Sequence, residues 1–170
     1  MKTKNLILLG IIVVAFSACT LTGESNYTPS IQLVKNPVNT KGDSVSIFYT
    51  DTINIYRMDT IHVGDTLNFK VYMNAFANNI KGYYMTQSDS TAKVLLPRKS
   101  AMDSLFSTNS NYNQGIFLLK KPLTTLYFPF QYVAKKPSMN TKLSLKVLSD
   151  ANFEFNQASF ILITPIVTRK

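Results

Sequence analysis

Cysteine is nearly absent from this chain, which has one, Cys19, among 170 residues. A single thiol cannot form an intrachain disulfide, so we expect side-chain packing alone to hold the fold. Tryptophan is missing altogether, and histidine occurs once, as His62. Zinc sites need clusters of His and Cys, so no zinc centre is expected. No other cofactor is expected either, because the sequence has no phosphate-binding loop and no dinucleotide fingerprint.

Residues that could carry catalysis are equally scarce. His62 lies between Ile61 and Val63 in a predicted strand, and no G-x-S-x-G motif supplies a serine nucleophile. We therefore interpret His62 as a strand residue whose hydrogen-bonding groups are satisfied by its neighbours. Among the nine acidic residues, only Asp150 and Glu154 form a candidate pair for glycoside hydrolysis, and that pair is weak. The sequence predicts a protein that is not an enzyme.

An Asp-Thr pair recurs along the first half of the chain, at Asp51-Thr52, Asp59-Thr60 and Asp65-Thr66. Calcium sites gather several oxygens in one tight loop, whereas these aspartates are separated by whole predicted strands. Asp side chains also bond nearby backbone amides at strand ends. We interpret the pairs as turns and expect no metal site.

Basic residues outnumber acidic ones, and the formal net charge is +9. They are scattered, however, and no run is longer than a pair such as Arg98-Lys99, Lys120-Lys121 or Lys135-Lys136. No nucleic-acid-binding signature is present, so we expect a solvated basic face and no nucleic-acid partner. Attraction to anionic lipid headgroups or acidic glycans is the weaker alternative.

The N-terminal segment carries the strongest pattern in the sequence. Lys2 and Lys4 precede an apolar stretch, Leu6–Phe16, and Ser17-Ala18 lead into Cys19. A basic start, an apolar stretch and small residues before a cut are the parts of a secretory signal. The stretch is shorter than the roughly 20 residues that a membrane-spanning helix needs. A cysteine directly after the cut resembles the lipobox of bacterial lipoproteins, although Phe16 stands where the lipobox usually has Leu.

The lipobox resemblance implies that the Cys19 thiol is acylated and becomes the first residue of the mature chain, so that one partner is the lipid bilayer. An ordinary cleaved secretory signal is the alternative. We divide the chain into a signal peptide (1–18), an acylated N-terminus with a flexible tether (19–29), and one domain (30–170). Removal of the signal lowers the charge to +7 and leaves 152 residues, enough for one domain with its own core.

Period-two alternation of apolar and polar residues predicts β-strands beyond the tether. The clearest is 65–74, with Leu67, Phe69, Val71 and Met73 on the buried face and Gly64-Asp65 as the turn before it. Similar stripes are Leu126, Phe128, Phe130 and Tyr132, and Leu143, Leu145 and Val147. Shorter strands are expected around Ile53, Ile55, Ile61 and Val63.

Two of the longer predicted strands contain proline. Pro129 interrupts Leu126–Val133, and Pro165 interrupts Phe160–Val167, which is apolar on both faces and suits a strand covered on both sides. Because proline cannot donate a ladder hydrogen bond, we expect these strands to lie at a sheet edge or to contain a bulge.

One short helix is predicted between two strands. Ser100 and Asp103 resemble a capping box with Ser100 as the N-cap, and Met102, Leu105 and Phe106 then fall on one helical face. Many short strands with turn signals between them predict an all-β fold, and the large aromatic faces favour a sandwich over a barrel.

The stretch Val63-Gly-Asp-Thr-Leu-Asn-Phe-Lys-Val71 is similar to the second-strand region of bacterial immunoglobulin-like domains. The expected strands 142–149 and 159–168, linked through Phe153-Glu-Phe-Asn156, resemble the last hairpin of such domains. Together with Cys19, the chain resembles a Bacteroides-type lipoprotein with an immunoglobulin-like β-sandwich. The Cys…Trp…Cys core of antibody domains is absent. The resemblance implies a fold class and a location, and no functional residue except Cys19.

A candidate binding surface rests on four tyrosines that we expect in or beside loops: Tyr83, Tyr84, Tyr112 and Tyr127. Exposed aromatic residues in loops often mark recognition surfaces. For each of them the alternative is that the ring packs on the core. The sequence favours a non-catalytic binding or adhesion module for a protein or glycan partner. The alternative is an accessory subunit of an envelope complex, paired through the edges of the proline-bearing strands.

The expected location is the outer membrane, because Thr20 after the cysteine is not the Asp that retains lipoproteins at the inner membrane of enteric bacteria. Only Glu24 provides acidity after Cys19, which leaves the periplasmic leaflet and the cell surface as alternatives.

Overall fold

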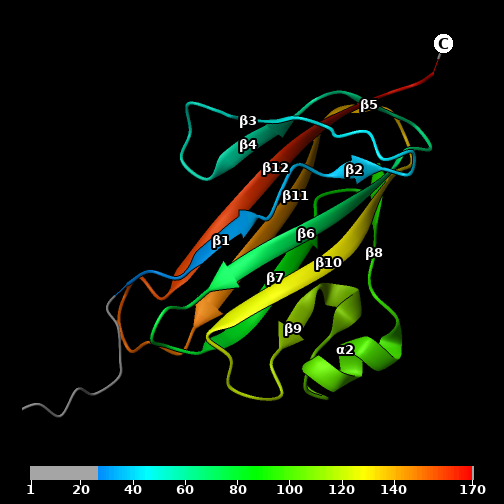
Figure 1. The fold of residues 1–170 in the computed structure, drawn as a ribbon. Coiled ribbons are helices and arrows are strands. Elements are labelled where there is room, and N and C mark those ends of the chain that lie inside the picture. Colours follow the sequence, from blue (N-terminus) through cyan, green and yellow to red (C-terminus); the bar gives the residue numbers. More distant parts are fainter. Residues whose placement is uncertain (1–26, 170) are drawn as a thin grey trace, which may run out of the picture.

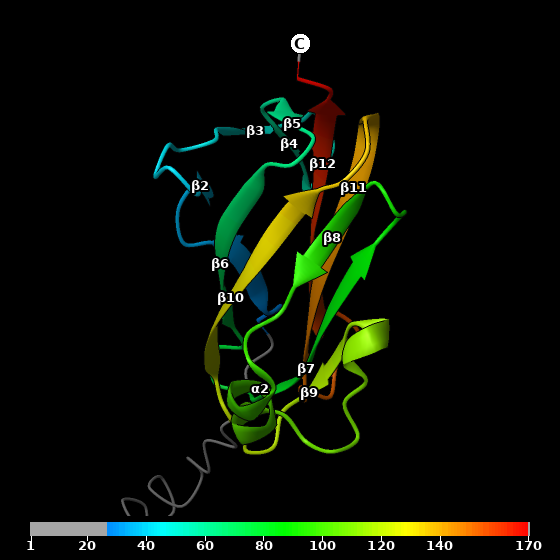
Figure 2. The ribbon, with the colours of Figure 1, turned by 90° about the vertical axis from the view of Figure 1, so that its right-hand side faces the viewer.

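A computed structural model describes residues 27–169 of the protein, which form two β-sheets packed face to face (Figure 1). The signal peptide, Cys19 and most of the expected tether lie outside the described residues. Turned by 90°, the ribbon shows β6 (Thr66–Asn74) and β10 (Thr125–Ala134) in one layer and β11 (Ser138–Ser149) and β12 (Gln157–Val167) in the other (Figure 2). The predicted all-β class is confirmed at this level: the described residues form two sheets and one short α-helix.

The smaller sheet has five strands, which pair in the order β1-β6-β10-β8 with β2 also on β6. Its strands are β1 (Ser30–Leu33), β2 (Val38–Asn39), β6 (Thr66–Asn74), β8 (Ala92–Leu95) and β10 (Thr125–Ala134). All of these pairs are antiparallel. The longest strand pairing in this sheet is the one between β6 and β10.

The larger sheet has seven strands in the order β3-β4-β12-β11-β7-β9, with β5 also on β12. They are β3 (Ile47–Tyr49), β4 (Ile55–Met58), β5 (Ile61–His62), β7 (Ile80–Gln87), β9 (Ile116–Leu118), β11 (Ser138–Ser149) and β12 (Gln157–Val167). β12 pairs antiparallel with β11, as the predicted closing hairpin requires, and parallel with β4 and β5.

The predicted alternation is confirmed in the long strands. In β6 the side chains of Leu67, Phe69, Val71 and Met73 are buried, while Asn68 and Lys70 are exposed. The inward residues predicted for β10 and β11 are buried in the same way. The expected strand at Ile53 is wrong, because Ile53 lies in the turn before β4 and is exposed.

Pro165 lies in an internal strand, whereas Pro129 lies in a part of β10 that has a neighbour on one side only. β12 stands between β11 and the β4/β5 pair, and the register with β11 shifts between Ser138 and Thr141, opposite Pro165. A bulge therefore accommodates Pro165, which was the second option in the prediction. β10 stands between β6 and β8, but β8 pairs with it only from Gln131 onward. At Pro129 the strand has β6 alone as its neighbour.

The predicted helix exists, but its capping was predicted wrongly. Helix α2 spans Lys99–Leu105, its N-cap is Arg98, and no side chain caps it. Ser100 therefore lies within the first turn, and Asp103 forms an ion pair with Lys99 one turn earlier. The helix therefore has an i,i+4 ion pair on its surface instead of the expected capping box. A 3-10 helix, η1 (Tyr112–Gln114), follows before β9.

An aromatic cluster fills the core at the α2 end of the sandwich. Phe117 of β9 lies 5.3 Å from Tyr83 of β7, 5.5 Å from Phe128 of β10 and 5.4 Å from Phe106 after α2, measured between ring centroids. These four rings are almost entirely buried. They join both sheets to α2 without any covalent link.

Tyr83 was expected on an exposed binding surface, and this expectation is wrong. Its ring is fully buried within the cluster, and its hydroxyl oxygen has no hydrogen-bond partner among the described residues. Burial accordingly raises the pKa of Tyr83 well above its usual range. A buried hydroxyl that lost its hydrogen bonds to water is a net cost to the folded state.

We predict that Tyr83→Phe will raise the free energy of unfolding by about 1 kcal/mol, because it removes a buried, unpaired hydroxyl and keeps the ring. Urea denaturation of the two proteins measures the difference. Tyr84→Phe is the matched control, and its half-buried residue should give a change within about 0.5 kcal/mol. A loss of stability in Tyr83→Phe would show that the hydroxyl has a partner in solution.

The turn between β5 and β6 depends on Asp65, as the interpretation of the Asp-Thr pairs requires. Asp65 Oδ2 accepts a hydrogen bond of 2.8 Å from the His62 amide, and its other oxygen pairs with the Arg169 guanidinium. Burial raises the pKa of Asp65, but the His62 amide and Arg169 outweigh this effect, so the pKa is lowered overall. Stability from this carboxylate is present above its unfolded pKa and is lost as the pH falls through the folded value.

We predict that Asp65→Asn will lower the free energy of unfolding by about 1 kcal/mol at pH 7. The difference from wild type should shrink as the pH falls below about 4, because the wild-type carboxyl then becomes protonated as well. Thermal unfolding at several pH values measures it. Asp59→Asn, in an exposed turn, is the control and should show no such pH dependence. A difference that stays constant with pH would contradict the proposed role of the charge.

Candidate functional site

The four tyrosines of the predicted binding surface lie in four separate places. Tyr83 is in the core, and Tyr84 is half-buried on the outer face of β7, beside Ser144 and Lys146 of β11. Tyr127 is exposed on the outer face of β10, 4.8 Å from the Tyr72 ring and 5.0 Å from Lys70 Nζ. Tyr112 lies in η1. The structure therefore does not bring these residues into one surface, because only Tyr112 is outside a strand and Tyr83 and Tyr84 point to opposite faces of β7.

Tyr112 does border a hollow, which opens between β7 and β8 at the border of the two sheets. Its volume is about 450 Å³, and its walls combine apolar and polar side chains: Met85, Thr86, Gln87, Val94, Leu96, Tyr112, Asn113, Gln114 and Phe117, with Gly115. The hollow is a possible site for a small polar ligand or for one side chain of a partner.

Gly115 sets the shape of this hollow. Its φ is +68°, and a Cβ atom at this position would lie 1.8 Å from the Met85 carbonyl oxygen. The Met85 amide in turn donates a 2.9 Å hydrogen bond to the Gly115 carbonyl oxygen. Only glycine fits this close approach, which holds η1 against β7.

Behind the hollow, three polar side chains are buried between the sheets. The Tyr132 hydroxyl lies beside Thr164 and Gln87, and none of the three groups makes a hydrogen bond of good geometry. Burial raises the pKa of Tyr132 to about 12, although its two polar neighbours act in the opposite direction. The three side chains include no carboxylate or imidazole, so they offer hydrogen bonding and no acid–base chemistry near neutral pH.

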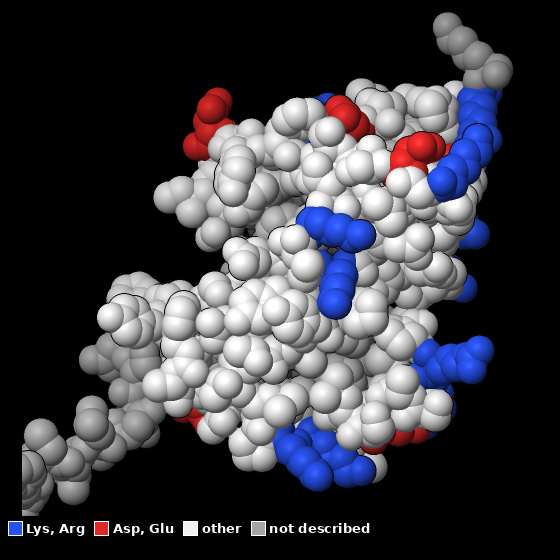
Figure 3. All heavy atoms as spheres, in the orientation of Figure 1, with Lys and Arg blue, Asp and Glu red and all other residues white. Residues whose placement is uncertain are grey.

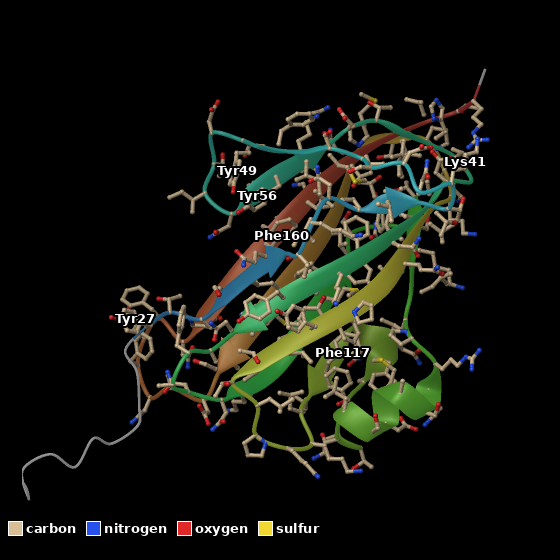
Figure 4. The ribbon with its side chains drawn as sticks, viewed as in Figure 1. Tyr27, Lys41, Tyr49, Tyr56, Phe117 and Phe160 are labelled. Carbon is tan, nitrogen blue, oxygen red and sulfur yellow. The ribbon has the colours of Figure 1, made fainter. Side chains whose placement is uncertain are left out.

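Three strongly exposed apolar residues lie close together in the β3–β4 hairpin. The exposed fractions are 53% for Phe48, 84% for Tyr49 and 86% for Ile53. Single exposed apolar residues need no explanation, but three within six positions form a patch. In the ribbon the hairpin protrudes from the side of the sandwich, with Tyr49 near its outer end (Figure 4).

Aromatic stacking connects this hairpin to the core. Tyr56 of β4 stacks on Phe160 of β12 with 4.3 Å between ring centroids, and Tyr49 of β3 lies 5.1 Å from Tyr56 (Figure 4). Phe160 is buried, Tyr56 is half-buried and Tyr49 is exposed, so the three rings lead from the core to the surface. The hairpin is thus a fixed part of the sheet that presents Tyr49.

The backbone of β3 faces an open edge. In the β3–β4 ladder, the Thr50 amide donates to the Ile55 carbonyl oxygen and the Asp59 amide donates to the Ser46 carbonyl oxygen. Hydrogen-bonded pairs alternate along an antiparallel ladder, so Ile47 and Tyr49 are the positions that do not bond to β4. Their amide and carbonyl groups point to the side of β3 on which no described strand lies.

The stretch of chain around the hairpin differs in charge from the rest. Between Lys41 and Lys70 there is no lysine, and Arg57 is the single basic residue beside four of the nine acidic ones (Asp43, Asp51, Asp59 and Asp65). Within the hairpin itself Asp51 and Arg57 balance each other, and Asp65 is paired with Arg169. In Figure 3 an acidic side chain stands at the upper left, over the hairpin, and basic side chains lie in separate places elsewhere on this face. A neutral or basic partner therefore suits the hairpin better than an anionic one.

Metal-binding side chains do not gather within residues 27–169. No three His, Cys, Asp or Glu side chains in this range lie close enough together to hold a metal ion. His62 is exposed at the end of β5, with Nδ1 3.8 Å from Asp65 Oδ2. Asp150 accepts hydrogen bonds of 2.8 and 3.0 Å from Asn79 and thereby joins two loops. No described helix has the length and apolar character needed to span a membrane.

The hairpin patch was missed from the sequence, although a signal was present. Ile47, Phe48 and Tyr49 are three consecutive apolar residues in an otherwise polar stretch. A strand that is apolar on both faces must be covered on both faces or present one of them to a partner. The hollow below Tyr112 has no comparable sequence signal, because residues from β7, β8 and η1 meet there only in the folded chain.

Comparison with known proteins gives this chain no relative: no protein-family model and no curated protein matches its sequence. Its function must therefore be inferred from its own residues and their geometry.

Proposed function

We propose that this protein is an envelope lipoprotein of the Bacteroides type, anchored through acylated Cys19, whose domain is a non-catalytic module that binds a protein partner along β3. One observation carries the binding part of the proposal. β3 is an edge strand that combines unpaired backbone groups at Ile47 and Tyr49 with exposed apolar side chains. An extended segment can add to such an edge, with backbone hydrogen bonds for affinity and side chains for specificity.

Two of the other sheet edges, β9 and β8, are less suited to this role. The edge of β9 is covered by the segment after α2. The Ser107 amide donates a hydrogen bond to the Leu118 carbonyl oxygen, and the Ile116 amide donates one to the Asn111 carbonyl oxygen. β8 carries Lys93, a residue type that discourages pairing at edges. β3 contains neither Lys nor Pro. Of the proline-bearing strands, proposed from the sequence as pairing edges, β12 lies inside its sheet, and β10 has an open side only over Thr125–Phe130, where Pro129 has no amide to donate.

A glycan partner is the second candidate, and the exposed Tyr49 ring favours it. A planar aromatic face can stack on a sugar ring, and the Tyr49 ring itself packs against the Tyr56 ring. The local acidic charge supports a neutral glycan over an anionic one. Adhesion or assembly within an envelope complex would use the same edge.

We also propose that the sandwich is immunoglobulin-like. The order β1-β6-β10-β8 corresponds to strands A, B, E and D of that fold, and β7-β11-β12 corresponds to C, F and G. This assignment makes β6 the second strand, as the Val63–Val71 resemblance implies. Two features depart from the pattern. β9, which lies beside β7 in the larger sheet, comes after β8 of the smaller sheet in the chain, and the β3–β4 hairpin extends the larger sheet beyond β12. The proposed binding edge is thus an addition to the common frame.

For the location we propose the outer membrane, on its periplasmic leaflet or at the cell surface. Protease treatment of intact cells distinguishes the two: digestion of the domain would place it outside, and survival would place it inside.

We predict that Cys19→Ala will move the protein from the membrane fraction to the soluble fraction, because the thiol that carries the lipid is lost. The thermal unfolding transition should stay unchanged, since a large hydrophobic core lies within residues 27–169. Fractionation and circular dichroism measure the two results. A variant that stays membrane-bound would contradict the proposed anchor.

We predict that Tyr49→Pro will abolish binding of a protein partner, because it removes an amide that points to the open edge while leaving the β3–β4 ladder intact. The matched control, Tyr49→Ala, removes the same ring and keeps the amide. A photoreactive amino acid placed at Ile53 in each full-length protein reports the contact in living cells. The proline variant should give about tenfold less of a defined protein adduct than the alanine variant.

Equal adducts in the two variants would contradict strand addition. If instead the purified protein binds a neutral glycan saturably, and both variants lose that binding equally, the glycan function replaces the protein one.

A further inference from the structure

The end of the sandwich where the described chain begins carries a second group of exposed aromatic side chains. Tyr27 is 72% exposed, Phe76 42% and Phe155 61%. Tyr27 lies at the lower left in Figure 4, at a different corner of the molecule from Tyr49. We call Tyr27, Phe76 and Phe155 the aromatic rim.

Hydrogen bonds hold the loops of the rim together. Phe76 belongs to the connection between β6 and β7, and its ring centroid is 5.7 Å from that of Tyr27. Phe155 belongs to the connection between β11 and β12. Asn79 and Asp150 join these two connections through three hydrogen bonds: two from Asn79 to the Asp150 carboxylate and one from the Asp150 amide to the Asn79 carbonyl oxygen.

Phe76 has an unusual backbone conformation. Its φ is +59°, in the left-handed region that bulky side chains rarely adopt, and its amide donates a 2.8 Å hydrogen bond to Asn74 Oδ1. Strain of this kind persists where the surrounding structure imposes it, and it is concentrated at functional positions. Here it accompanies a phenylalanine ring that is left partly in solvent.

The distance to Cys19 limits what can cover this rim. Seven residues separate Cys19 from Tyr27, so the two Cα atoms can be at most about 28 Å apart. β12 alone, with 11 residues, is about 36 Å long. With Cys19 held in the bilayer, the end of the sandwich that carries Tyr27 therefore lies close to the lipid surface.

The charge of this end fits a lipid surface that contains anionic headgroups. The connection between β9 and β10 contains Lys120 and Lys121, both exposed, and it is bonded to the β6–β7 region through Ala75 to Thr124 and Ile80 to Leu123. Asp150 and Glu154 are the acidic residues of the neighbouring loop, and Asp150 is already bonded to Asn79. Aromatic rings beside lysines are typical of protein surfaces at the membrane interface.

We infer that the aromatic rim inserts into the headgroup region of the same bilayer that holds the lipid of Cys19, and so fixes the orientation of the domain on the membrane. This inference rests on the proposed lipid anchor. The rim is a second membrane contact beside the lipid of Cys19. It leaves the β3–β4 hairpin, at its separate corner, available to a partner.

The absence of tryptophan allows a direct test, because each introduced tryptophan is the single one in the chain. Full-length lipidated variants Phe155→Trp, Phe76→Trp and Tyr49→Trp are reconstituted into vesicles of phosphatidylethanolamine and phosphatidylglycerol with brominated acyl chains. We expect the first two variants to lose most of their emission relative to unbrominated vesicles and to show blue-shifted spectra. Tyr49→Trp is the control and should keep its emission.

Weak and equal quenching of all three variants, in protein that still fractionates with the vesicles, would overturn the inference and leave the anchor intact. Protection of the Phe155→Trp emission from aqueous iodide without quenching by bromine would also overturn it, because another part of the protein would then cover the rim. Wild-type protein that does not fractionate with membranes at all would instead refute the anchor.

Discussion

Pro165 constrains the larger sheet, because it lies in an internal strand, two residues before the end of β12, with neighbouring strands on both sides. It cannot donate a hydrogen bond to either of them. On one side the register between β11 and β12 shifts opposite it, and on the other the parallel pairing stops after Ile163 and resumes at Ile166. The chain therefore leaves the sheet at the end of β4, passes through Asp59 and Thr60, and returns as β5. The β3–β4 hairpin is a separate unit for this reason, attached to β12 over Ile161–Ile163 and by the stacking of Tyr56 on Phe160.

Much of the fold could be predicted from the sequence, because alternation depends on local geometry. The buried faces of β6, β10 and β11 follow from every second residue being apolar. The neighbours of each strand could not be predicted in this way, and this is why an edge and a bulge both stayed open as alternatives for Pro129 and Pro165. The helix was found from its apolar spacing, whereas its start depends on Arg98 and the Lys99–Asp103 pair, which no simple capping rule describes.

The candidate site likewise has features that local sequence patterns predict and features that depend on the whole fold. Met85 follows Tyr83 by two positions and Thr86 follows Tyr84 by two, so alternation alone places Tyr83 inside and Tyr84 outside. The expectation that both are exposed gave too little weight to this pattern. The hairpin patch has a local signal in Ile47-Phe48-Tyr49, but its openness depends on the absence of a further strand beside β3, which is a property of the whole sheet. The rim depends on loops that are more than 70 residues apart in the chain, joined by Asn79 and Asp150.

The close approach of Gly115 to Met85 has a consequence for the search for relatives of this protein. Most core positions can exchange one apolar residue for another of similar volume, so a distant relative need not share them. A position at which a single methyl group would lie 1.8 Å from a backbone oxygen allows no such exchange. A glycine just before a short apolar strand, about thirty residues after a strand that contains a paired tyrosine, is therefore a better marker of common ancestry than overall identity. A relative identified in this way would show whether the added hairpin and the aromatic rim have been inherited together.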